Sequence, residues 1–221
     1  MIYEFPDRNA AIRQGDIFVG LPRVEISLKN LAVLSENNVT EVIPWNTIVE
    51  EGKNVSAILG IRPVTAIVAT QDCDTIHSPD ITLCEVREFQ DVDRSTKSCN
   101  NPKAWMHAIT QQARKNLKWF YLPPEGRIGF SRRMAVDFLV TIRIAREDLW
   151  EHRHLRKGRL IPEADEHFRE RLAEFFRRYP YDEWYPLEKA EFAEYKRTYP
   201  ETEPREWQKE PPASPAPANT A

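Results

Sequence analysis

The sequence has few cysteines and lacks the short motifs that mark the commonest cofactor and metal sites. Its three cysteines, Cys73, Cys84 and Cys99, are an odd number and include no CxxC pair. This usage predicts a reducing compartment rather than a disulfide framework, and it disfavours a structural zinc site. The absence of GxGxxG, GxxxxGK[ST] and HExxH lowers the expectation of dinucleotide-binding, P-loop and zincin chemistry, so we expect no cofactor.

Long apolar runs and a strong charge of one sign are also missing. No apolar stretch approaches about 18 residues, so we expect no membrane-spanning helix. Residues 1–16 lack the apolar core of a signal peptide. The formal net charge of -3 provides no global basic field, so any contact with nucleic acid has to come from a local patch. These features predict a cytoplasmic protein that makes no membrane contact.

What is present is a series of short alternating strands, with helices only later in the chain. At 221 residues, 41% of them hydrophobic, the chain can build one core with appendages. Strands are predicted over 17–19, 24–34, 55–59, 64–70, 81–86, 119–122 and 135–144, and helices over 101–116 and 163–179. The pattern predicts an α+β fold with a strongly bent, mostly antiparallel sheet.

Three regions are predicted along the chain. Residues 1–150 form a β-barrel-like domain with an inserted helix near 101–116, and residues 151–200 form a helical extension. The helix over 163–179 carries an apolar face made of Phe168, Leu172, Phe175, Phe176 and Tyr179. Residues 201–221 are rich in proline, alanine and charge, so they cannot bury enough surface to offset their chain entropy, and we predict a disordered tail.

The most informative stretch is RPVTAIVATQDCDTIHSPDITLCEV, residues 62–86. A β-branched run ends abruptly in polar and ionisable side chains, and a second β-rich run follows a turn signal. Asp72 and Asp74 therefore lie at the mouth of a predicted hairpin, directly after a buried strand. Carboxylates in such a place need solvent, a metal, a cation or a ligand. We expect cationic groups around them, with Arg62 among the nearest and Arg13 or Arg87 as the next candidates.

Two interpretations of this hairpin mouth stay open. Asp72, Asp74 and His77 have the spacing D-x-D-x-x-H, which a loop can wrap around a divalent cation. Alternatively, the two aspartates cap backbone N–H groups in an ordinary turn.

Two short motifs stand out between residues 12 and 88: Arg13-Gln14-Gly15-Asp16-Ile17 near the start, and Arg62-Pro63-Val64 before a β-rich run. Together they resemble the pattern of the MazF/PemK-like toxin family. The resemblance implies a small SH3-like β-barrel, here with added helices and a disordered C-terminal tail. It also implies a sequence-specific, metal-independent endoribonuclease of a bacterial toxin–antitoxin or defence system.

The resemblance also implies roles for individual residues. Arg62 matches the family's catalytic arginine, which stabilises the transition state at phosphorus, and Asp72 and His77 are then candidates for the acid/base pair. The competing interpretation is that Arg62 only neutralises nearby carboxylates such as Asp16, Asp72 or Asp74. Two acidic residues in the Gln-Asp-Cys-Asp loop depart from the family pattern, because they repel an RNA phosphate unless they are neutralised.

The candidate nucleic-acid contacts are basic residues near the start of the chain and after residue 150. The cluster HRHLRKGR at residues 152–159 carries Arg153, Arg156 and Lys157, and Arg13 belongs to the toxin-like pattern. Acidic neighbours make a self-compensated surface an equally good interpretation of the cluster.

Three hypotheses for function follow. The first is a MazF/PemK-like RNA-binding protein or ribonuclease using Arg62, Asp72 and His77. The second is a non-catalytic module that holds a protein partner, such as an antitoxin, a complex subunit or a second copy. The third is a metal-dependent enzyme that uses Asp72, Asp74 and His77.

Overall fold

The computed structural model describes residues 2–34, 40–52, 54–93, 101–112, 117–177, 189–201 and 203. The chain divides into two compact units, Met1–Arg177 and Arg178–Ala221. In the second unit the described element is one helix, α8 (Lys189–Thr198). Most of the tail predicted over 201–221 lies outside the described residues.

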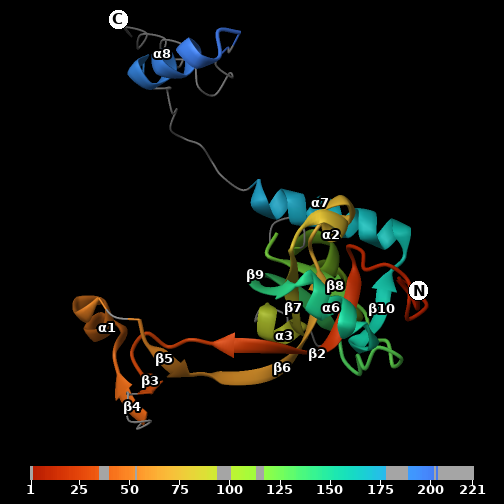
Figure 1. Ribbon diagram of the computed structural model, residues 1–221. Coiled ribbons are helices and arrows are strands. Elements are labelled where there is room, and N and C mark those ends of the chain that lie inside the picture. Colours follow the sequence, from red (N-terminus) through yellow and green to blue (C-terminus); the bar gives the residue numbers. More distant parts are fainter. Residues whose placement is uncertain are drawn as a thin grey trace, which may run out of the picture. The chain divides into compact units, whose positions relative to one another are not determined.

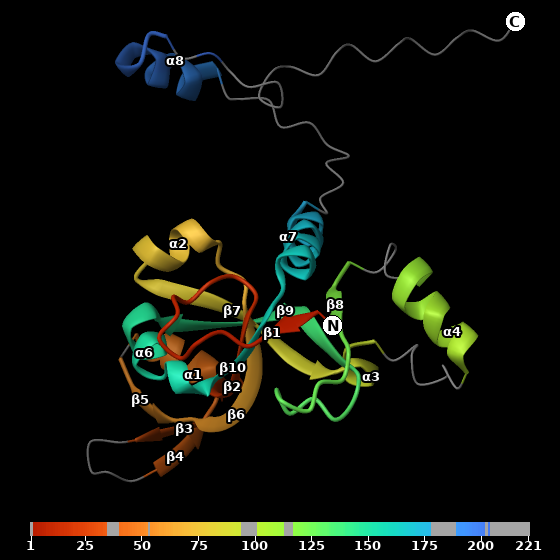
Figure 2. The same ribbon diagram turned by 90° about the vertical axis from the view of Figure 1, so that its right-hand side faces the viewer.

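The first unit is built on a curled, antiparallel seven-stranded half-barrel in the order β1-β10-β2-β6-β7-β9-β8 (Figures 1 and 2). The α+β class and the mostly antiparallel, bent sheet are therefore confirmed. The strands are β1 (Tyr3–Glu4), β2 (Asp16–Glu25), β6 (Gly60–Val68), β7 (Asp80–Glu88), β8 (Trp119–Leu122), β9 (Met134–Ala145) and β10 (Arg156–Leu160).

Each face of this sheet buries apolar side chains, because neighbouring residues along a strand point to opposite faces. On one face, Ile17, Ile67 and Phe138 pack under α7 (Pro162–Phe176) through Phe168 and Leu172. On the other, Phe18 and Leu83 pack with Leu149 of α6 (Arg146–Glu151).

The predicted helix over 163–179 is confirmed in α7, but its predicted face is only partly right. Phe168 is fully buried, whereas Phe176, at the last turn, is 62% exposed. The predicted member Tyr179 lies outside the described residues.

The predicted helix over 101–116 begins as expected and changes geometry midway. Asn101 caps α4 (Pro102–His107), its side-chain oxygen accepting from the Ala104 N–H at 2.8 Å, and Pro102 occupies the first turn. The helix continues as a π-helical segment, Ala108–Gln112, and the last predicted residues lie outside the described ones.

The predicted strand over 24–34 is wrong, because its two ends belong to different sheets. β2 ends at Glu25, and β3 (Leu31–Leu34) is the central strand of a separate three-stranded sheet in the order β4-β3-β5. The other two strands of this sheet are β4 (Thr40–Ile43) and β5 (Ser56–Ile58). Between them in the chain lies the helix α1 (Trp45–Glu51). We call residues 24–61 the arm. It is carried on the paired ends of β2 and β6, where Glu25 faces Gly60 in the ladder (Figure 1).

The hairpin mouth is a helix rather than an open loop. β6 and β7 pair as predicted, but Asp72–His77 between them forms the short helix α2, with Gln71 at its N-cap position. The remaining elements among the described residues are α3 (Phe89–Val92) and the 3₁₀ turn η3 (Arg153–Leu155).

Candidate functional site

Asp72 is held by Arg13 and Gln14 at the start of α2. Its carboxylate accepts hydrogen bonds from Arg13 Nη2 at 2.8 Å and from the Gln14 backbone N–H at 2.8 Å. Burial alone would raise the pKa of Asp72, but the Gln14 N–H and the Arg13 guanidinium together lower it below its ordinary value. Arg13, the second candidate, is therefore the cation on Asp72, and the pairing ties α2 to the turn before β2.

The turn before β2 requires a glycine at residue 15 because the backbone φ there is positive and because α7 lies close to it. Gly15 has a φ of +80°, and a Cβ there would lie 2.8 Å from Asp165 Oδ1 on α7. Asp165 is buried and pairs through Oδ2 with Arg169 at 2.8 Å. Burial raises the pKa of Asp165 against the opposing effect of Arg169. Gly15 thus allows the turn before β2 to pack closely against α7.

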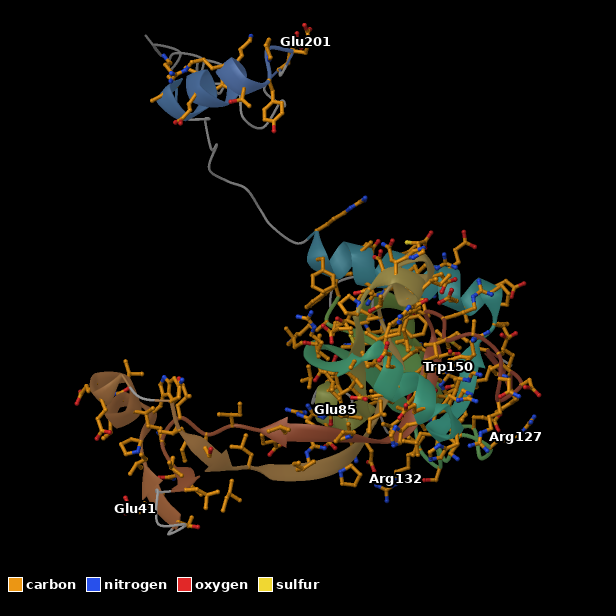
Figure 3. The ribbon with its side chains drawn as sticks, in the orientation of Figure 1. Glu41, Glu85, Arg127, Arg132, Trp150 and Glu201 are labelled. Atoms are coloured by element: carbon orange, nitrogen blue, oxygen red, sulfur yellow. The ribbon has the colours of Figure 1, made fainter. Side chains whose placement is uncertain are left out.

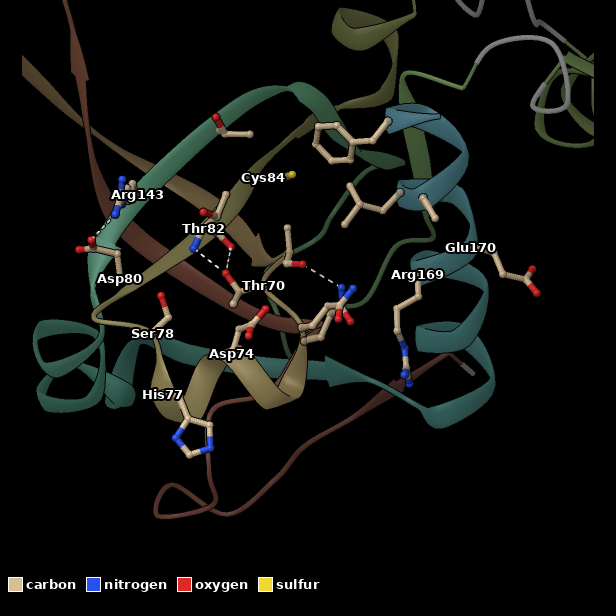
Figure 4. A pocket seen from close by; sticks show the side chains of 17 residues that line it. Thr70, Asp74, His77, Ser78, Asp80, Thr82, Cys84, Arg143, Arg169 and Glu170 are labelled. Carbon is tan, nitrogen blue, oxygen red and sulfur yellow. Dashed lines mark hydrogen bonds and ion pairs between the residues drawn. The ribbon is translucent and has the colours of Figure 1, made fainter. Parts of the chain in front are cut away.

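Asp74 and His77 of α2 are among the residues that line a broad groove of about 1,040 Å³ between α2, β7, β9 and α7, and Asp74 points toward Thr70 (Figure 4). Hydroxyl groups line its floor, and Thr70 Oγ1 accepts from the Thr82 backbone N–H at 2.7 Å. Arg143 pairs with Asp80 at its rim, at 2.5 Å. Within the described residues, no three His, Cys, Asp or Glu side chains gather closely enough to hold a metal ion, so Asp72, Asp74 and His77 do not form such a group.

Arg62 is separated from the α2 residues and has acidic partners of its own. It lies opposite Arg23 in the β2/β6 ladder and pairs with Glu85 at 3.0 Å and with Glu25 at 2.9 Å. Glu85 is buried and is also paired with Arg23. Arg62 and Val68 are six residues apart on β6, about 20 Å along an extended strand. The structure therefore does not bring Arg62 together with Asp72 and His77, and the expected contact between Arg62 and Asp72 is wrong.

The basic residues after 150 are divided between the interior and the surface. The Arg156 side chain is only 2% exposed, pairs with Asp16 at 3.0 Å and donates to backbone carbonyl oxygens of residues 7, 8, 10 and 11. It holds the N-terminal segment against the sheet and is not presented to a ligand. Arg153 stacks on the Trp150 ring at 4.6 Å, and the exposed Lys157 donates to the His154 carbonyl.

A longer segment, residues 94–136, carries a larger excess of positive charge than the cluster at 152–159. Its basic residues are spread out, so a search for dense runs of basic residues does not single it out. Residues 94–136 carry nine basic residues and one acidic residue, Glu125, for a net charge of +8. Because the whole chain carries -3, the remaining residues sum to -11. The nine are Arg94, Lys97, Lys103, Arg114, Lys115, Lys118, Arg127, Arg132 and Arg133, of which residues 94, 97, 114 and 115 lie outside the described residues.

The described part of this segment combines arginines with aromatic rings. The Arg133 guanidinium lies 4.0 Å from the centre of the Trp105 ring, and Trp105 packs edge-on against Tyr121 and Phe89, each at 5.3 Å. Arg132 is exposed and pairs with Glu88 at 3.0 Å.

A hollow of about 500 Å³ opens beside this stack, lined by Glu88, Phe89, Gln90, Trp105, Pro124, Ser131, Arg132 and Arg133. Figure 3 shows Arg132 and Arg127 at the outer surface of the part of the first unit that surrounds the seven-stranded sheet. We call Trp105, Tyr121, Arg132 and Arg133 the basic aromatic face.

Comparisons with models of known protein families, with curated proteins and with solved structures find no match. Among the described residues, no helix is long and apolar enough to cross a membrane. The geometry and charge of the chain therefore carry the functional argument.

Proposed function

We propose that this chain binds single-stranded nucleic acid through the basic aromatic face. The observation that carries the proposal is the net charge of +8 in residues 94–136, within a chain whose net charge is -3. Such segregation creates the local patch that a globally acidic protein needs to attract a polyanion.

The chemistry of the face fits an unpaired strand better than a duplex. Trp105 and Tyr121 are half-buried, so their rings are anchored by packing while part of each stays accessible. Bases stack on such rings irrespective of sequence, and each stacked base contributes about 1–3 kcal/mol. Arg133 supplies positive charge for the phosphates that follow, and the exposed Arg132 joins it by exchanging its contact with Glu88 for a phosphate.

The MazF/PemK-like resemblance agrees with this proposal in one respect, because it also implies that the chain binds RNA. The curled antiparallel half-barrel supports the SH3-like fold that the resemblance implies. Cleavage is less well supported, because Arg62 is neutralised by Glu25 and Glu85 and stands apart from Asp72 and His77. We therefore propose binding without cleavage as the activity of the chain.

The test is fluorescence anisotropy with a 5′-labelled single-stranded RNA and the full-length protein, repeated over a series of salt concentrations. Arg132→Ala and Arg133→Ala are expected to weaken binding and to reduce the slope of log affinity against log salt concentration by about 0.7 for each lost phosphate contact. Arg143→Ala is the matched control, because Arg143, like Arg132, is an exposed arginine paired with one carboxylate.

Equal losses in all three variants would contradict the proposed location, and undetectable binding by the wild-type chain would contradict the proposal itself. Incubation of the same RNA with the protein in EDTA separates binding from metal-independent cleavage. An intact RNA is the expected result, whereas fragments that disappear in Arg62→Ala would restore the ribonuclease hypothesis.

A further inference from the structure

The hollow beside the basic aromatic face contains hydrogen-bonding groups that simple stacking and charge attraction do not require. Besides Trp105 and two arginines, its lining includes Glu88, Gln90 and Ser131, and its volume of about 500 Å³ is that of a small-molecule pocket. Stacking on aromatic rings tolerates any base, whereas polar groups at the edge of a base distinguish one base from another. The hollow is therefore the part of this face that can select a particular base.

Glu88 and Gln90 are held at the hollow by the buried residue between them. Glu88 is the last residue of β7, and Gln90 lies in the first turn of α3. Phe89 is 2% exposed and packs edge-on against the Trp105 ring, and its backbone N–H donates to the Arg133 carbonyl at 3.0 Å. These contacts fix the backbone of residues 88–90, so both polar side chains start from a rigid base.

The two side chains present a defined row of hydrogen-bonding groups. Gln90 Nε2 donates to Glu88 Oε2 at 2.9 Å, so the two carboxylate oxygens and the amide nitrogen are neighbours, and the second N–H of the amide remains for a ligand. A carboxylate only accepts and an amide nitrogen only donates, so the row is acceptor, acceptor, donor. Cytosine presents the same row, through O2, N3 and its amino group, when it pairs with guanine.

We propose that the hollow binds a guanine base of the strand, with Glu88 accepting from guanine N1–H and N2–H and Gln90 donating to O6. This inference rests on the proposed nucleic-acid binding and names the base that the same face selects. Among the RNA bases, guanine alone presents two neighbouring donors beside an acceptor on its Watson–Crick edge. Adenine, cytosine and uracil each place a lone pair against the carboxylate or leave one of its oxygens without a donor, which costs affinity.

Arg132 occupies the carboxylate in the free protein, and an RNA phosphate can take its place. Arg132 Nη1 lies 3.0 Å from each oxygen of Glu88, but the arginine side chain is 67% exposed. An exposed pair of this kind contributes little to stability, so the exchange of partners costs little. In the complex Arg132 pairs with a phosphate and Glu88 with the base edge, which leaves neither charge alone. The Arg133 guanidinium, 4.0 Å from the centre of the Trp105 ring, offers the base a plane on which to stack.

The test compares labelled RNAs by fluorescence anisotropy with the full-length protein. The RNAs are a uridine-only strand and the same strand with one central guanosine, adenosine, cytidine or inosine. The guanosine strand is expected to bind roughly fivefold or more tightly than the uridine strand, the discrimination that one bidentate contact to a base edge provides. Inosine lacks the N2 amino group, so it is expected to lose most of this gain.

Glu88→Gln is expected to remove the preference for guanosine and to bind the uridine strand at least as well as the wild type does, because it removes a negative charge and releases Arg132. Glu25→Gln is the matched control, since Glu25, like Glu88, is a glutamate paired with an arginine at the protein surface. It makes the same change of charge and is expected to keep the preference.

Equal binding of the guanosine and uridine strands by the wild type would overturn guanine selection and leave strand binding in place, as would a preference that survives in Glu88→Gln. Failure to bind any of the strands would overturn both. The inosine comparison uses the wild-type chain, so it decides the question even if a variant folds poorly. Free GMP at the concentration of the RNA is not expected to displace the strand, because it supplies one base and one phosphate. Displacement would assign the hollow to a free guanine nucleotide instead.

Discussion

At the scale of single residues, most of the charged side chains singled out by the toxin-like resemblance are paired within the protein. Asp72 is held by Arg13 and Gln14, and Arg62 is held by Glu25 and Glu85. Asp16 is buried between Arg156 and Arg159, at 3.0 and 2.6 Å. Removing one partner of the buried Asp16 pairs leaves an uncompensated charge, so we expect Arg156 and Arg159 to stabilise the fold.

The pairing of Asp72 predicts an acid-dependent contribution to stability. Its folded-state pKa is lowered, so its contribution is present above its unfolded value of about 3.8 and is lost as the pH falls through the lower folded-state value. We expect Asp72→Asn to melt at a lower temperature than the wild type at pH 7, and we expect this difference to shrink below about pH 4. Thermal melts from pH 7 to pH 3 check this. A difference that stays constant with pH would show that the carboxylate charge is not what stabilises α2.

At the scale of elements, the apolar face of α7 fixes the helix on the sheet from Ala164 in its first turn to Phe175 in its last, and Phe176 is left outside this contact. Phe168 is fully buried and contacts the rings of Phe120 and Phe138, whereas Phe176 lies at the end of the helix and is 62% exposed. An apolar pattern predicts the side of a helix that faces the core, but it does not show where the underlying sheet ends.

These two phenylalanines provide a matched pair of substitutions. Phe168→Ala is expected to lower the free energy of unfolding by about 3–5 kcal/mol, because it leaves a cavity in the core. Phe176→Ala, the same change on the same helix, is expected to cost under about 0.5 kcal/mol, since little of this side chain is buried. Urea denaturation measures both. Small, equal effects would mean that α7 is only loosely attached.

The features that the sequence predicts well are those with a clear local pattern. The pairing of β6 with β7, the helix α7 and the Asn101 cap all follow from local patterns. The break between β2 and β3 was not predicted, because the alternation continues through Ile26 and Leu28 although both are exposed. The short helix α2 was not predicted, because its six residues bury only Thr75 and show no apolar pattern of helical period.

The candidate site was only partly predictable for a similar reason. Arg13 could be named as a cation for Asp72, but not preferred over Arg62, because the choice depends on which strands lie side by side. The basic aromatic face left a clear signal in the sequence, the near absence of acidic residues over 94–136. Dense runs of basic residues point to 152–159 instead, because the basic residues of 94–136 are spread over a longer segment. The stacking of Arg133 on Trp105 joins the residue just before β9 to the helix α4, and only the fold reveals it.

At the scale of the whole molecule, charge and apolar surface are segregated to different parts of the first unit. Residues 94–136 hold nine of the 31 basic residues but one acidic residue, which gives the segment a net charge of +8. Among the described residues, ten of the sixteen exposed large apolar side chains lie on the arm, residues 24–61.

The most direct test of the central claim is to locate the nucleic acid on the protein. Single-stranded RNA containing 4-thiouridine is irradiated in complex with the full-length chain, and the linked peptides are identified by mass spectrometry. We predict adducts in the peptides that contain Trp105, Tyr121 or Arg133, and their loss in Trp105→Ala. Adducts confined to the groove around Thr70 and His77, or to Arg62 on β6, would contradict the account.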